Sequence, residues 1–167
     1  TTLARPWVIP GTPGMEHRLG GLEKHPGTGA VSYAPEDHAA MCALRRDKVA
    51  GVAGFIPEIE VSGPEEGDLL VLSWGGARGA AITAVERLQG KGRRVAHAQL
   101  RYLNPFPRNL GEVLQRYPTV MIPELNLGQL AMLIRAKYLV EVVSFARVQG
   151  RPFTVDEIEA RAGELLA

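Results

Sequence analysis

Four polar or glycine-rich segments follow apolar runs from residue 73 onward. They span residues 73–79, 101–107, 123–129 and 146–153. In parallel sheets, ligands approach the carboxyl ends of strands, where helix N-termini present free N–H groups. The first segment, SWGGARG, joins a strand to a helix as a phosphate-binding turn does. It matches neither the dinucleotide nor the P-loop spacing, so we interpret its glycines as a tight turn.

The titratable side chains form no recognised catalytic pattern. No serine lies in a nucleophile elbow, and the four histidines lack a metal-binding spacing. We predict that His25 and His38 are loop and helix-surface residues, and that His97, within a strand, is a hydrogen-bonded structural histidine. Glu124, at a strand end, is suited to acid–base chemistry, to capping the next helix, or to an ion pair with Arg101 or Arg108. The sequence therefore predicts no catalytic or metal-ligating residue.

Cys42 is the only cysteine of the chain. One thiol cannot form an internal disulfide, hold an iron–sulfur cluster or complete a cysteine-based zinc site. Because Cys42 lies between Met41 and Ala43 in a predicted helix, we expect it to be a small buried hydrophobe.

The composition is that of a globular chain with a buried core, since 46% of the residues are hydrophobic and 22% are charged. Nineteen basic side chains balance eighteen acidic ones. This balance provides no electrostatic reason to expect a nucleic acid or an anionic membrane as a partner. No apolar run has the length of a membrane span and no signal peptide is recognisable, so we expect a cytoplasmic protein.

The first 30 residues are rich in proline and glycine and show no helical or strand period. We predict that residues 1–30 are a loop or linker from a preceding domain, and that residues 31–167 form a single α/β domain. Pro35 should begin a helix whose apolar side chains, including Val49, Val52 and Phe55, share one face. Residues 57–68 should be a polar connector.

From Leu69 onward, apolar strands alternate with amphipathic helices. The predicted strands are 69–72, a strand that begins at 95–98 and runs to the segment LRYLNPFP, 119–122 and 140–145. The spacings Asn126 to Gln129 and Thr154 to Glu157 predict capping boxes for two of the helices. Continuously apolar strands between helices indicate a parallel sheet covered on both faces. The periodicity therefore predicts a three-layer α/β/α fold with all strands parallel.

Several segments, in order, resemble the C-terminal domain of the α subunit of 2-oxoacid:ferredoxin oxidoreductases, of the 2-oxoglutarate type. They are PGTPGMEHRLGGLEK (10–24), VSYAPEDH, DLLVLSWGG, VAHAQLRYLNPFPRNLGEVL, PELNLGQL (123–130) and VQGRPF (148–153). LNPFP and PELNLGQL carry most of the specificity, and the resemblance covers nearly the whole chain. It implies a transketolase C-terminal-like domain, with a mostly parallel sheet of about five strands in which one strand is antiparallel.

The resemblance also implies a function. These complexes oxidatively decarboxylate a 2-oxoacid to an acyl-CoA and reduce ferredoxin, using thiamine diphosphate, magnesium, an iron–sulfur cluster and coenzyme A. The diphosphate and cluster sites belong to the β subunit, in agreement with the single cysteine and the missing G-D-G motif here. We therefore expect a non-catalytic domain that binds no cofactor itself. Its partners would be the preceding α-subunit domains, the β subunit and, through the complex, ferredoxin.

Anionic substrates suggest which residues would contact them. The loop 10–24 carries two cationic groups and a histidine, and arginine suits a carboxylate because its planar fork donates two parallel hydrogen bonds. Amide side chains at strand ends could line the same substrate-binding surface, which we call the wall, or merely cap helices. The candidates for this substrate or coenzyme A wall are His17, Arg18, Lys24, Asn104, Asn126 and Gln129. The alternative for Arg18 is an ion pair with Glu16 or Glu23.

Two other functions remain open at this point. The chain could be the matching domain of a transketolase-like or 2-oxoacid dehydrogenase subunit, or a stand-alone small-molecule-binding α/β domain. The long loop 10–29 argues against the stand-alone domain, because a free-standing domain gains little from ordering such a loop.

Overall fold

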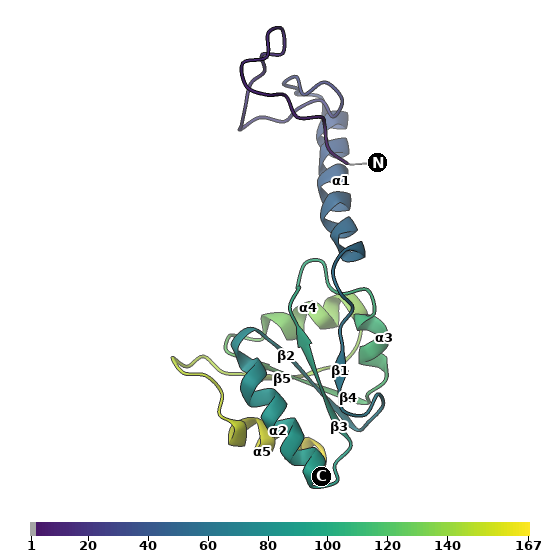
Figure 1. Cartoon of the computed structure of the whole chain (residues 1–167), viewed down its shortest axis with the longest axis vertical. Coiled ribbons are helices and arrows are strands. Elements are labelled where there is room, and N and C mark those ends of the chain that lie inside the picture. The colour runs from purple at the N-terminus through teal and green to yellow at the C-terminus, as the bar shows by residue number, and fades with distance from the viewer. Residues whose placement is uncertain (1–2) are drawn as a thin grey trace. The chain divides into compact units, whose positions relative to one another are not determined.

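The computed structural model describes residues 3–167, which divide into two compact units with the boundary between Phe55 and Ile56 (Figure 1). The predicted boundary at residue 31 differs from this, because the helix that follows the N-terminal loop groups with the loop and not with the sheet. The role of residues 1–30 as a linker from a preceding domain stays a prediction.

The N-terminal unit contains one long helix, α1 (Pro35–Gly51), followed by a short 3-10 helix, η1 (Val52–Gly54). Proline in the first turn, with Glu36 and Asp37 beside it, begins α1 as predicted. The predicted apolar face is present but not packed: no residue of α1 is buried, and Phe55 is 90% exposed. Residues 3–34 contain no helix or strand beyond an isolated antiparallel bridge between Lys24 and Val31.

The C-terminal unit is built on one five-stranded sheet of order β1-β3-β2-β4-β5. Its strands are β1 (Val61–Ser62), β2 (Leu69–Trp74), β3 (Val95–Leu100), β4 (Thr119–Glu124) and β5 (Val143–Ala146). The mostly parallel α/β fold is confirmed. The all-parallel interpretation is wrong at β1, which pairs antiparallel with β3 inside the supposed connector 57–68. Two residues are too few to show a strand period, so periodicity could not find β1.

Helices cover both faces of this sheet (Figure 1). They are α2 (Arg78–Gly90), preceded by the turn η2 (Gly75–Ala77), then α3 (Leu110–Gln115), α4 (Gln129–Tyr138) and α5 (Val155–Leu165). Leu69 and Val71 of β2 pack with α2 and α5, whereas Leu70 and Leu72 pack with α3 and α4. Both faces of β2 are therefore buried, which explains why residues 69–72 are all apolar.

The two predicted capping boxes have different outcomes. Thr154 and Glu157 form both reciprocal hydrogen bonds at the start of α5, as predicted. The predicted box at Asn126 and Gln129 is wrong. The buried carboxylate of Glu124 caps α4 instead, accepting from the backbone N–H groups of Leu130 (2.8 Å) and Ala131 (3.0 Å). A carboxylate at a helix N-terminus also interacts favourably with the helix dipole.

No helix in the part of the chain that the structure describes is long and apolar enough to span a membrane.

The packing predicts opposite effects for two Gly→Ala substitutions. A Cβ at the buried Gly67 would lie 2.6 Å from the backbone oxygen of Arg94, which already accepts from Asp68 N. Gly67→Ala should therefore lower the free energy of unfolding by about 1–3 kcal/mol, the usual cost of overpacking. Gly163, within α5, meets nothing within 4 Å, so Gly163→Ala should raise it by roughly 0.5–1 kcal/mol. Urea unfolding of both variants measures this, and a neutral Gly67→Ala would contradict the packing at the start of β2.

Candidate functional site

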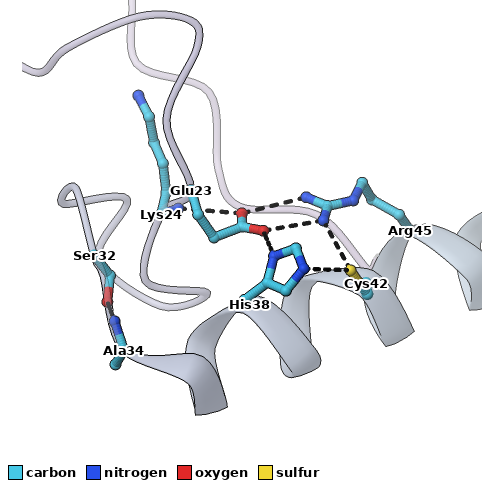
Figure 2. Close-up of polar contacts among 7 residues, drawn as sticks. All are labelled: Glu23, Lys24, Ser32, Ala34, His38, Cys42 and Arg45. Carbon is cyan, nitrogen blue, oxygen red and sulfur yellow. Dashed lines mark hydrogen bonds and ion pairs between the residues drawn. The ribbon is translucent and has the colours of Figure 1, made fainter.

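Glu23 is the centre of the polar contacts in the N-terminal unit (Figure 2). His38 Nδ1 donates to its Oε2 at 2.8 Å, and Arg45 donates to both carboxylate oxygens, at 3.3 and 3.1 Å. These hydrogen bonds, that from Arg45 first, lower the pKa of Glu23 to about 2. The Glu23 carbonyl also accepts from Ser32 N at 3.0 Å. The contacts fasten residues 23–32 to the first turns of α1.

Cys42 lies beside this ion pair and is exposed, so the prediction of a buried hydrophobe is wrong. Its Sγ lies 3.7 Å from His38 Nε2 and 3.3 Å from Arg45 Nη2 (Figure 2). The error follows from the assumption that the apolar face of α1 packs within this chain. His38 is on the helix surface, as predicted, and its side chain is 67% exposed.

Glu23, His38 and Cys42 place three potential ligand atoms within 4.8 Å of one another. The guanidinium of Arg45 contacts the carboxylate and the sulfur of this group. A bound metal cation would lie next to that positive charge and would have to displace its hydrogen bonds. We therefore describe the cluster as an anchor between loop and helix rather than a metal centre.

The predicted wall residues of the loop lie on the surface and are not joined by their side chains. His17 Nδ1 contacts Met15 O at 3.0 Å, and Lys24 Nζ donates to the Arg18 carbonyl oxygen. The alternative ion pair of Arg18 with Glu16 or Glu23 does not form. Glu16 accepts from Gly14 N, and within residues 3–167 the guanidinium of Arg18 has no ion-pair partner.

The wall candidates at strand ends have different environments. Asn104 is exposed after β3. Asn126 Oδ1 accepts from Gly128 N (2.7 Å) and Gln129 N (3.2 Å), while its Nδ2 donates to Glu124. Gln129 Oε1 accepts from Leu127 N at 3.1 Å. Asn126 and Gln129 thus hold the turn before α4, whereas Glu124 caps the helix itself.

The sheet contains a buried series of hydrogen-bonded side chains that the sequence did not predict. His97 itself was predicted to be a hydrogen-bonded structural histidine, and this is confirmed. His97 is 3% exposed, and its Nε2 lies 2.8 Å from Ser73 Oγ. Ser73 Oγ lies 2.6 Å from Gln99 Oε1, and Gln99 Nε2 donates to Leu100 O. This orients the amide so that Ser73 donates to Gln99 and accepts from His97 Nε2–H. The Nδ1 atom of neutral His97 is therefore an acceptor.

His97 lines a pocket of about 290 Å³ within the C-terminal unit. Side chains from the segment before β1, from β3 and from α2 form it, among them Glu58, Glu60, Arg78, Gln99 and Arg101. Burial, and secondarily the charge of Arg78, lower the pKa of His97 to about 4. The ring is therefore neutral at physiological pH.

The anchor at Glu23 predicts a protection pattern. Trypsin should cut wild type faster after Arg18 than after Lys24, because the Lys24 backbone is held by the bridge to Val31 and by Glu23 Oε1. In Glu23→Gln, which removes the charge that binds His38 and Arg45, the cut after Lys24 should accelerate. Glu16→Gln is the matched control and should leave that rate unchanged. Equal rates at the two sites in wild type would contradict the anchor.

The depressed pKa of His97 predicts a loss of stability in acid. The unfolded chain takes up the proton near the ordinary pKa of 6.5, whereas the folded chain resists it down to about 4. The free energy of unfolding should therefore fall between pH 6.5 and 4, by up to about 3 kcal/mol. In His97→Gln, which keeps a donor for Ser73, this part of the slope should disappear in denaturant titrations. In His17→Gln, at an exposed histidine, it should persist. Parallel pH profiles for wild type and His97→Gln would refute the assignment.

Comparison with known proteins gives relatives of one kind. The sequence profile of the family described as pyruvate:ferredoxin oxidoreductase core domain II matches residues 67–158. The 2-oxoglutarate oxidoreductase subunit KorA of Mycobacterium tuberculosis is 53% identical over 94% of this chain. The α subunit of 2-oxoacid:ferredoxin oxidoreductase 2 of Aeropyrum pernix is 33% identical over 80%. The chain covers only 24% and 22% of these two proteins.

The solved structures agree. A 2-oxoglutarate:ferredoxin oxidoreductase from Magnetococcus marinus, with 2-oxoglutarate, coenzyme A and succinyl-CoA bound, superposes with a TM-score of 0.88 at 33% identity. It covers 97% of this chain, which in turn covers 29% of that one. A split-gene transketolase superposes over 64% of this chain and 41% of its own, with a TM-score of 0.50 at 20% identity, and shows the fold alone. The resemblance seen in the sequence is thereby confirmed, and the chain belongs to the core domain II family of the pyruvate:ferredoxin oxidoreductases.

Proposed function

We propose that this chain is a non-catalytic domain of the α subunit of a cytoplasmic 2-oxoglutarate:ferredoxin oxidoreductase. The observation that carries the proposal is the 53% identity to a 2-oxoglutarate oxidoreductase subunit over 94% of the chain. Its partners are then the preceding domains of the α subunit, the β subunit and, through the complex, ferredoxin. The reaction would be oxidative decarboxylation of 2-oxoglutarate to an acyl-CoA.

The residues of this chain do not fit the redox and thiamine cofactors of such a complex. A four-cysteine cluster cannot be held by Cys42 alone, and its nearest polar neighbours, His38 and Arg45, leave the sulfur beside a cation. The turn Gly75–Ala77 lacks a diphosphate motif, and Gly75 adopts a φ of 56° as a tight turn requires. We therefore propose that thiamine diphosphate, magnesium and the cluster bind outside this domain.

The loop 10–24 supports a role in anion recognition. The exposed guanidinium of Arg18 has no ion-pair partner within residues 3–167, so its five donors are available to a carboxylate or a phosphate. Lys24, by contrast, is tied back to the loop by its bond to the Arg18 carbonyl. Of the six wall candidates, Arg18 is therefore the strongest. Asn126 and Gln129 are occupied by the turn before α4.

The test uses the assembled complex that contains this chain, assayed with 2-oxoglutarate, coenzyme A and ferredoxin. We expect 2-oxoglutarate to be preferred over pyruvate. Arg18→Gln should lower kcat/KM for 2-oxoglutarate or coenzyme A on the order of ten- to a hundredfold, because a charge-assisted hydrogen bond contributes about 1.5–3 kcal/mol.

Arg116→Gln is the matched control, since Arg116 is exposed at the end of α3 and forms no ion pair within residues 3–167. Its kinetics should equal those of wild type. Wild-type kinetics for both substrates in Arg18→Gln would restrict the domain to a role in assembly. A complex without activity toward any 2-oxoacid would overturn the functional proposal, leaving the transketolase-like alternative.

A further inference from the structure

The pocket beside His97 is lined by an imidazole whose Nδ1 atom has no hydrogen-bond partner within residues 3–167. In residues 3–167, every buried side-chain nitrogen or oxygen has a hydrogen-bond partner. His97 Nε2 has Ser73, whereas no hydrogen bond forms at Nδ1. A fully buried Nδ1 without a partner would contradict this, so the atom is accessible from outside, and we infer that it is reached through the pocket that the ring lines. A ligand group that donates a hydrogen bond could satisfy it.

The ring is held in this orientation by its neighbours. Ser73 and Gln99 fix the proton on Nε2 through the chain of bonds that ends at Leu100 O. Because the low pKa keeps the ring neutral, Nδ1 stays an acceptor at physiological pH. The acceptor is thus preorganised on β3 before any ligand arrives, which lowers the entropic cost of binding.

Exposed charged side chains of both signs line the same pocket. Arg78 at the start of α2 and Arg101 after β3 line the pocket together with Glu58 and Glu60. None of these four groups forms an ion pair with another residue of the described chain 3–167. Two cations and two carboxylates around a neutral imidazole fit a ligand that carries both charges, because an ion of one sign would leave like charges facing it.

The size of the pocket limits the ligand. Its volume of about 290 Å³ is at the lower end of the usual range for small-molecule sites, roughly 300–1,000 Å³. Coenzyme A is too large for it, so we expect a smaller ligand.

We propose that this pocket binds a small zwitterion of the amino acid class. The carboxylate would pair with Arg78 and Arg101, and the ammonium group would donate to His97 Nδ1 and to the carboxylates of Glu58 and Glu60. Binding at this place would couple β1, β3 and α2, since all three contribute to the lining. The site does not depend on the activity of the complex.

The test is a titration of the 167-residue chain followed by NMR of its backbone amides and of the His97 ring nitrogens. L-Glutamate and L-alanine serve as zwitterions, succinate as an anion without an ammonium group, and butylammonium as a cation without a carboxylate. The zwitterions should shift the amides of residues 60–62 and 97–101 to saturation. They should also move the His97 Nδ1 resonance while Nε2 stays protonated.

Arg78→Gln and Glu60→Gln should each raise Kd on the order of tenfold or more, because each removes one charge-assisted contact. Arg116→Gln, outside the pocket, should leave Kd unchanged. Unchanged melting temperatures would show that the pocket variants remain folded. The proposal fails if neither zwitterion saturates the shifts up to about 10 mM. It also fails if succinate or butylammonium binds equally well, or if both pocket variants bind as wild type does. These outcomes are independent of the kinetic test with Arg18→Gln.

Discussion

Burial of β2 on both of its faces is the constraint on which the C-terminal unit depends. Leu69 to Leu72 are completely buried, with α2 and α5 against one face and α3 and α4 against the other. Each such side chain contributes about 1.5–3 kcal/mol by leaving water. The two neighbouring strands, β3 and β4, are parallel to β2, and the connections β2–α2–β3 and β3–α3–β4 place helices over the sheet.

The same burial determines where polar groups are tolerated. Ser73, His97 and Glu124 are the buried polar or charged residues of the described chain, and each is hydrogen-bonded. Glu124 stabilises the start of α4, so a charge at the end of β4 positions the next helix. Ser73 and His97 satisfy each other across two strands, which leaves one imidazole nitrogen toward the pocket at the edge of the sheet.

The N-terminal unit is stabilised by a different kind of interaction. No residue of α1 is buried, and its contacts with the loop are exposed or half-exposed hydrogen bonds and ion pairs around Glu23. Such contacts contribute little individually. Val49 of α1, Val52 of η1 and Phe55 after η1 remain exposed.

The sequence alone determined the features that depend on local pattern. The apolar runs identified the long strands, because strands buried on both faces are continuously hydrophobic. The Thr154 and Glu157 spacing identified a cap that needs only one helical turn. The tertiary structure alone decided what depends on distant neighbours. Strand β1 is defined only by its pairing with β3, the choice between Glu124 and Asn126 as the cap of α4 was open in the sequence, and Cys42 is exposed because no residue of α1 is buried. Ser73 and Gln99 lie 26 positions apart, and they meet because β2 and β3 pair in a register that places one opposite the other. No spacing in the sequence encodes that register, since it is determined by how two separately buried strands align.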